Sequence, residues 1–313
     1  MNKWKNKLKY NEFEKNQNRV LPVFANINLL GKCNVDCYFC LGKDLNEEFG
    51  KFNSLNQHFK TWKNFDYFVH KVLEAKIKRV YVTGQNTDSL LYKYLDELID
   101  YFQSKKINVG LRTNGYLALK KIETIQKCKR NVGYSIHSLN SNTNHVIMKR
   151  DDLPNWDTII PNTPKCRVSV VLNRYNANEF YDLLKYISKF KNVKYIQVRR
   201  ICTDTREDYL IKDVEIYEEI FKQIQKDHKQ LTTFYNAEVY RIFGKRVCFW
   251  RTVKTSIESY NYYTDGTFND EYFVIEGYQR SSDNYDKING IPVVPIKPLE
   301  GYWRTSEEIT TRI

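Results

Sequence analysis

The sequence is poor in proline and glycine, with 7 Pro and 12 Gly among 313 residues. This scarcity excludes a collagen-like chain and a low-complexity, disordered one. No run of 18 apolar residues occurs, so no segment is expected to span a membrane. Met1–Arg19 is polar and charged, unlike a secretory signal. We therefore expect a globular, cytoplasmic protein with no membrane partner.

Acidic residues are outnumbered, 37 Asp and Glu against 50 Lys and Arg, which gives a net charge of +13. Such a balance is typical of proteins that bind nucleic acid or phosphorylated molecules. A solvated, lysine-rich surface produces the same number. The net charge is therefore compatible with an anionic partner, but it does not distinguish such a partner from a solvated surface.

Short β-rich runs alternate with helical stretches, and no internal repeat interrupts them. The six strand candidates are Val23–Leu30, Arg79–Thr83, Ile107–Arg112, Asn131–Ile136, Cys166–Leu172 and Val193–Arg199. The stretches that follow them are Phe59–Lys76, Ser89–Ser104, Leu117–Lys127, the mixed Asn142–Ile160, Glu179–Phe190 and Val214–Lys226. Six strand–helix units predict an α/β fold with a parallel sheet, arranged as a partial (βα)6 TIM-like barrel. In such folds the chemistry lies at the C-terminal ends of the strands.

Three parts of the chain are expected: an N-terminal extension at 1–22, the partial barrel at 23–229, and a small α+β extension at 230–313. Within the last part, Ser259–Tyr263 and Tyr272–Ile275 are predicted strands joined through an Asp-Gly turn. We expect this extension to cover the substrate.

Three of the seven cysteines, Cys33, Cys37 and Cys40, lie within eight residues, directly after the first predicted strand. An odd count without a secretory signal argues against a disulfide framework. Three thiolates on one loop can hold three corners of an iron–sulfur cluster and leave one iron open. The alternatives are a structural zinc, for which the fourth ligand is missing, and three buried thiols in a polar loop.

The C-x3-C-x2-C spacing, with the aromatic Phe39 just before the third cysteine, resembles the signature of radical S-adenosylmethionine (SAM) enzymes. Together with the strand–helix order, the resemblance covers roughly residues 23–200. It implies a 4Fe–4S cluster on the three cysteines and SAM on the open iron. One electron from an external reductant, such as flavodoxin or ferredoxin, would cleave SAM to methionine and a 5′-deoxyadenosyl radical. That radical would abstract a hydrogen atom from the substrate.

The resemblance also implies contacts to SAM at the end of the second strand. Gly84, Gln85 and Asn86 stand where the family has a Gly-Gly-Glu stretch that receives the SAM amino group. Here Gln85 replaces a glycine and Asn86 replaces the acid, so only amide and backbone oxygens are present to accept. The alternative is a helix N-cap, which is a common role for Asn, Thr or Asp.

Later strand ends supply the other implied contacts to SAM, which are Asn114, Ser135, Asn173 and the backbone at Val198. His137 stands where the family often has an Asp, and it is either a substrate contact or a hydrogen-bonded histidine at a strand end.

Basic side chains supply the candidate substrate contacts. Arg199 and Arg200 alternate at the end of the sixth strand, so one is expected to face the barrel mouth and bind a carboxylate or phosphate. Arg246 and Arg251 lie in a basic segment interleaved with aromatic residues, which suits a nucleotide or nucleic acid. The alternative for this segment is an amphipathic packing element.

Cys202 follows the sixth strand and is either a hydrogen-atom donor to the substrate radical or a small buried residue. Only Cys248 lies beyond it, so no auxiliary cluster is expected.

The sequence thus predicts a radical SAM enzyme acting on a small anionic molecule, such as a nucleotide or a nucleotide-linked or phosphorylated sugar. One alternative is an enzyme that modifies nucleic acid or a peptide. The other is a non-catalytic iron–sulfur or zinc protein.

Overall fold

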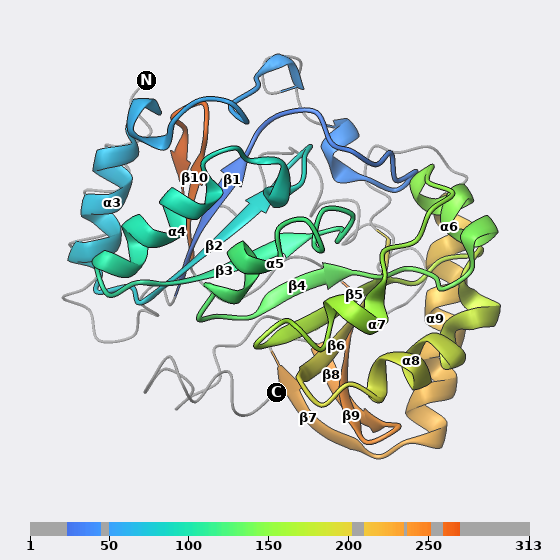
Figure 1. The fold of residues 1–313 in the computed structure, drawn as a ribbon. Coiled ribbons are helices and arrows are strands. Elements are labelled where there is room, and N and C mark those ends of the chain that lie inside the picture. Colours follow the sequence, from blue (N-terminus) through green and yellow to red (C-terminus); the bar gives the residue numbers. More distant parts are fainter. Residues whose placement is uncertain (1–23, 45–49, 202–209, 235–236, 252–258, 270–313) are drawn as a thin grey trace.

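The computed structural model describes residues 24–44, 50–201, 210–234, 237–251 and 259–269. Within them, eleven strands form one sheet in the order β11-β10-β1-β2-β3-β4-β5-β6-β9-β8-β7. The central strands are β1 Phe24–Leu29, β2 Arg79–Gly84, β3 Asn108–Thr113, β4 Val132–Ser135, β5 Cys166–Val171 and β6 Val193–Arg199. Each pairs in parallel with the next, which confirms the predicted α/β class and strand order (Figure 1).

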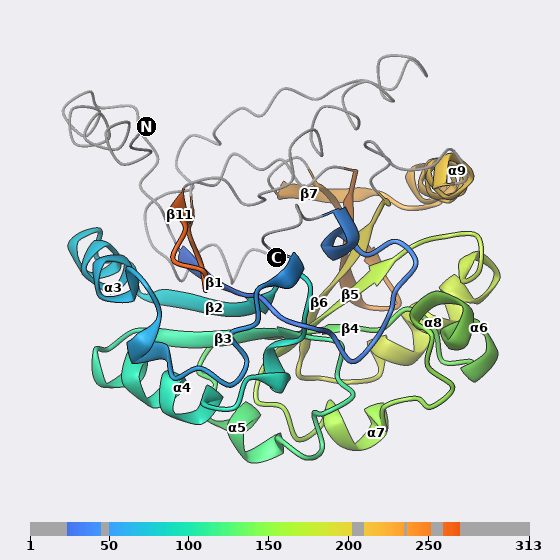
Figure 2. The ribbon, with the colours of Figure 1, turned by 90° about the horizontal axis from the view of Figure 1, so that it is seen from above.

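Helices lie along the outer face of the curved sheet (Figure 2). They are α3 Phe65–Glu74, α4 Leu95–Ser104, α5 Ile122–Gln126, α6 Ser141–Met148, α7 Trp156–Ile159, α8 Phe180–Ser188 and α9 Ile211–Asp227. Short 3-10 turns cover Leu41–Asp44, Phe59–Thr61, Ser89–Leu91 and Ala177–Glu179. No helix in the described residues is long and apolar enough to cross a membrane.

Some predicted helices are divided where the local backbone cannot continue a helix. The stretch Phe59–Lys76 breaks because Asn64 adopts a left-handed conformation (φ 61°) before α3 begins. The mixed stretch Asn142–Ile160 contains α6 and α7, with Pro154 between them.

The two faces of the sheet differ in polarity because side chains alternate along each strand. In β1, Ala25, Ile27 and Leu29 are buried in the core under the helices. The alternate residues Asn26 and Asn28 are polar and point to the other face. The apolar core therefore lies between sheet and helices, and the concave face is left for polar side chains.

The C-terminal strands extend the sheet at both edges. β9 Lys245–Trp250 pairs in parallel with β6 and carries the antiparallel strands β8 Ala237–Ile242 and β7 Gln230–Phe234. At the far edge, β10 Ser259–Tyr263 pairs in parallel with β1 and carries β11 Phe268–Asn269. The predicted strand Ser259–Tyr263 is confirmed.

The other predicted strand of this extension, Tyr272–Ile275, lies outside the described residues, as does most of the part expected to cover the substrate. The division of the chain at residues 22 and 229 therefore stays a prediction.

Candidate functional site

The cysteine loop leaves the C-terminal end of β1 and is held by two neighbours. The backbone N–H of Gly31 donates to the side-chain oxygen of Asn86, at 3.0 Å. On the other side, the N–H groups of Asp36 and Tyr38 donate to the last carbonyls of α6, those of Met148 and Ile147, at 3.0 and 3.1 Å. The loop is thus fixed between the β2 loop and the end of α6.

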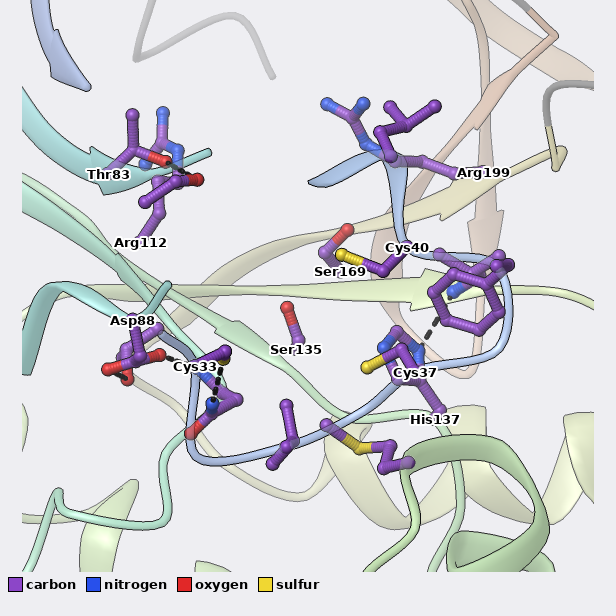
Figure 3. Close-up of a pocket in the computed structure, with 18 of the residues that line it drawn as sticks. Cys33, Cys37, Cys40, Thr83, Asp88, Arg112, Ser135, His137, Ser169 and Arg199 are labelled. Carbon is purple, nitrogen blue, oxygen red and sulfur yellow. Dashed lines mark hydrogen bonds between the residues drawn. The ribbon is translucent and has the colours of Figure 1, made fainter. Parts of the chain in front are cut away.

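A cavity of about 310 Å³ lies at the C-terminal ends of the parallel strands, and all three loop cysteines line it. Figure 3 shows Cys33, Cys37 and Cys40 around one space, with Ser135 and Ser169 drawn between them and Arg199 above. The predicted residues Phe39, Gly84, Gln85, Asn86, Asn114, Ser135, His137 and Arg199 also line it. The fold therefore brings residues from five strand ends to the cysteine loop.

The cysteines fit an iron–sulfur cluster better than a single metal ion. None of the three forms a disulfide. Around one zinc, thiolates bound at about 2.3 Å would lie roughly 3.8 Å from one another. The described residues contain no group of three His, Cys, Asp or Glu side chains close enough to hold one ion. A cluster places each cysteine on a different iron, so three cysteines that line one cavity can hold it.

The thiolate form of these cysteines needs a positive partner. Burial raises the pKa of Cys33 to about 11 and that of Cys37 well above its usual value, and the charges of the neighbouring cysteines add to both shifts. Bound metal reverses this preference because it binds the thiolate directly. The N–H of Gly42 and the side-chain amide of Asn114 already point at Cys40 and Cys33, with nitrogen–sulfur distances of 3.3 and 3.8 Å.

The end of β2 is built around a glycine. A Cβ atom at Gly84 would lie 1.8 Å from the carbonyl oxygen of Thr87, so no other residue fits there. Gln85 donates from its amide to Asn28, at 2.9 Å, and the Asn86 oxygen is used by Gly31. These two side chains hold the loop in shape, and their contacts with SAM stay predictions.

Asp88 is a site residue that the sequence reasoning did not single out. Its buried carboxylate accepts hydrogen bonds from the N–H groups of Leu90 and Asn114, at 2.9 and 2.6 Å, and from the hydroxyl of Thr113, at 2.9 Å. The N-cap alternative raised for this segment is therefore observed at Asp88. Through Thr113 and Asn114 it fixes the end of β3 against the β2 loop.

His137 follows the alternative of a hydrogen-bonded histidine at a strand end. Its Nδ1 accepts from the N–H of Val171 at 3.1 Å, and its ring packs edge-on against Phe39, with centroids 5.1 Å apart. Burial lowers its pKa to about 4, so the ring is neutral at physiological pH. It lines the cavity and supports the cysteine loop.

Two of the predicted SAM contacts do not line the cavity. Asn173 is fully buried and closes a turn, because its amide donates to the carbonyl of Val171 and its oxygen accepts from the N–H of Tyr175. The Val198 side chain is fully buried in the core under the helices, and the contact of its backbone with SAM stays a prediction. Cys202, the predicted hydrogen-atom donor, lies outside the described residues.

Arg199 and Arg200 diverge as their alternation predicts. Arg199 faces the cavity near the ring of Trp250, 5.8 Å from its centroid. The guanidinium of Arg200 is bound to Glu218 of α9, at 2.8 Å. Arg251 binds the other oxygen of the same carboxylate, also at 2.8 Å. Glu218 therefore holds two arginines on the flank of the site.

The basic, aromatic segment follows the alternative of an amphipathic packing element. It forms the β8–β9 hairpin, where Phe249 stacks on Phe221 of α9 with centroids 5.0 Å apart. Arg251 is held by Glu218, and Arg246 lies at the start of β9, at the opposite end from Trp250. Neither arginine lines the cavity, whereas Trp250 does.

Arg112 is a further cavity residue that the sequence reasoning missed. It lies at the end of β3 with its guanidinium over the ring of Tyr81, 4.3 Å from the centroid. The available signal was a charged residue that alternates with the buried Val109 and Leu111 along a strand. That pattern places Arg112 on the concave face.

Fold and site together define an α/β enzyme with a thiolate-bound iron–sulfur centre at the C-terminal ends of parallel strands. The sequence model of the Radical SAM superfamily matches residues 27–187, more than half of the chain. The chain belongs to this superfamily. The predicted cofactors, a 4Fe–4S cluster and SAM, are therefore confirmed, as is the need for an external reductant.

A curated relative, "Probable GTP 3',8-cyclase" of Methanococcus maripaludis, is 29% identical over 101 residues. That alignment spans 32% of this chain and 31% of the relative. The Streptococcus suis protein SuiB with bound SAM superposes with a TM-score of 0.58 at 14% identity, covering 93% of this chain and 71% of SuiB. SuiB bound to its precursor peptide SuiA gives a TM-score of 0.56, also at 14% identity, covering 96% and 71%. At this identity the likeness shows the fold alone.

Proposed function

We propose that this radical SAM enzyme abstracts a hydrogen atom from a small anionic substrate, such as a nucleotide or a phosphorylated or nucleotide-linked sugar. One observation carries the proposal: the described cavity wall contains Arg112 and Arg199, besides Arg200, whose charge is matched by Glu218, and a single acid, Asp88. The Asp88 carboxylate is already engaged by three donors. Arginine forks bind carboxylates and phosphates in two-point contacts.

The basic character continues beneath the cavity. Gly133 of β4 separates the stems of Arg112 and Arg167. A Cβ atom there would lie 3.0 Å from Nε of Arg167 and 3.1 Å from Cδ of Arg112. Arg167 is 6% exposed, and its Nε has no hydrogen-bond partner in the described part of the chain. Two like charges at this depth repel each other and favour an anion above them.

One of the comparisons also favours a small molecule. The partial match to a relative named as a GTP cyclase is consistent with a nucleotide, although it covers only a third of each chain.

Different residues of the chain would bind the cluster, bind SAM and orient the substrate. Cys33, Cys37 and Cys40 would hold the cluster, which supplies the electron that cleaves SAM. Gly84, Asn86, Asn114 and Ser135 would line the SAM site at the strand ends. Arg112 and Arg199 would then orient the anionic group of the substrate so that a C–H bond faces the radical, and Phe39 and Trp250 would help to exclude water.

The test is a substrate screen on the anaerobically reconstituted enzyme with dithionite and SAM. We expect 5′-deoxyadenosine, and its formation should rise with nucleotides, nucleotide sugars or sugar phosphates. A deuterated substrate should pass its label into 5′-deoxyadenosine. Stimulation by RNA or peptides but by no small anion would overturn the proposal in favour of a macromolecular substrate.

Two arginine variants sharpen the screen. Arg112→Gln should raise the KM for the anionic substrate about tenfold or more, since a charge-assisted hydrogen bond contributes about 1.5–3 kcal/mol, while SAM binding should be kept. The matched control is Arg241→Gln, at an exposed position of the β8–β9 hairpin. Equal KM values in the two variants would argue against an anion at Arg112.

A further inference from the structure

A second cavity, of about 610 Å³, lies on the other side of the cysteine loop. Cys33, Cys37 and Cys40 line this outer cavity as well as the inner one. The loop is therefore a thin wall between the SAM and substrate side and the outside of the molecule.

The outer cavity is rimmed by four lysines, Lys32, Lys43, Lys51 and Lys149. The only acid in its described lining is Asp36, whose carboxylate is bound to Lys43 at 2.7 Å. Lys32 and Lys149 are exposed and form no ion pair with an acid in the described part of the chain. Their charge is thus available to a partner from outside.

Backbone contacts fix these lysines beside the cysteines. Lys149 ends α6 in a left-handed conformation (φ 56°), directly after the two carbonyls that bind the cysteine loop. The carbonyl of Lys32 accepts a hydrogen bond from the hydroxyl of Thr87, at 3.1 Å. The positive rim therefore keeps its position relative to the three thiols.

We propose that this rim of four lysines, in which Lys32 and Lys149 offer charge to a partner, is the docking surface for the reductant, an acidic protein that carries single electrons on a flavin. The proposal rests on the proposed function, because only radical cleavage of SAM requires the electron. SAM and substrate fill the inner side during turnover, so the electron must enter from the outer side of the loop. The carrier loses one electron, the cluster gains it, and no proton or bond changes at the lysines.

Charge complementarity is the physical basis of this choice. Opposite charges steer the encounter of two proteins and raise the association rate by about 10- to 1000-fold, with a steep dependence on ionic strength. Lysines at a rim act on the rate of encounter more than on the stability of the protein, and their replacement should leave the fold intact.

The experiment compares two reductants on the cluster-loaded enzyme. A reduced flavodoxin is the carrier and dithionite is the small-molecule control, and the rate of cluster reduction is followed by its absorbance under anaerobic conditions. The variant is Lys32→Glu with Lys149→Glu. We expect reduction by flavodoxin to slow at least tenfold and reduction by dithionite to stay within twofold of the wild type. Raising the salt concentration from about 50 to about 300 mM should slow the reduction of the wild type by flavodoxin but not that of the rim variant.

The matched control replaces two exposed lysines elsewhere by glutamate. They are Lys78, which precedes β2, and Lys226 of α9. It changes the net charge equally and should keep the flavodoxin rate. If the rim variant keeps its flavodoxin rate, or slows with both reductants, the docking surface is overturned. Failure of the proposed function looks different: the wild-type cluster then accepts electrons from dithionite but forms no 5′-deoxyadenosine with any small anion. If the rim variant instead loses RNA- or peptide-dependent turnover with dithionite, the lysines serve a macromolecular substrate.

Discussion

Acid should weaken the fold through His137, and the size of the effect follows from its surroundings. Burial and the hydrogen bond from Val171 hold the ring neutral, and burial lowers its pKa to about 4 from the usual 6.5. Because the folded pKa lies below the unfolded one, this histidine stabilises the fold fully only above pH 6.5, and the contribution falls as the pH drops toward 4. At about 1.4 kcal/mol per pKa unit, the loss between pH 7.5 and pH 5 is about 2 kcal/mol.

The assay is urea unfolding of the reduced, metal-free chain, followed by tryptophan fluorescence at pH 7.5 and at pH 5. His137→Asn keeps an acceptor for the Val171 N–H but does not titrate. It should be less stable than the wild type at pH 7.5 by about 1 kcal/mol, because it loses the ring contact with Phe39. Its additional loss at pH 5 should be smaller than that of the wild type by about 2 kcal/mol.

The control is Phe39→Leu, which loses the same ring contact with His137 but keeps the imidazole. This variant should keep most of the pH dependence of the wild type. Equal pH dependence in the wild type and His137→Asn would refute the argument that burial keeps His137 neutral.

Three further substitutions test the site. Cys37→Ala should lose both the iron content and SAM cleavage, and a variant that still cleaves SAM would contradict its assignment as a ligand. Asn86→Ala removes the acceptor for Gly31 and should weaken SAM binding severalfold while iron analysis shows a loaded cluster; an unchanged SAM affinity would mean that this loop does not hold SAM. Asp88→Asn weakens the acceptor for the N–H of Asn114 and should lower stability by about 1–3 kcal/mol in thermal unfolding, which an unchanged midpoint would contradict.

Local sequence was enough for much of the fold. The strands Val193–Arg199 and Ser259–Tyr263 have the predicted bounds, because β-branched and aromatic residues in short runs favour extended backbone in almost any context. The cysteine spacing likewise identified the cluster loop, since three thiolates within eight residues are a local requirement of the cofactor. Each of these features depends on residues that are close together in the chain.

Tertiary contacts decided the rest. The residues from Gln230 to Trp250 contain three strands. Of these, β9 pairs in parallel with β6, about 50 residues earlier in the chain, and so covers that sheet edge. Arg251 was expected at the substrate and instead binds Glu218 of α9. The sequence does not show that α9 packs beside this arginine. Asp88 and Arg112 were missed because their roles arise from partners on neighbouring strands.

The sequence by itself determined the α/β class, the order of the parallel strands and the family, since periodicity and motif spacing are properties of neighbouring residues. Only the tertiary structure decided which side chains share the cavity. It placed Arg112 and Arg199 in the inner cavity and turned Arg251 to Glu218. It also set Lys32 and Lys149 on the outer side of the cysteine loop. The physical reason is that the direction of a side chain depends on strand register and on partners far away in the chain.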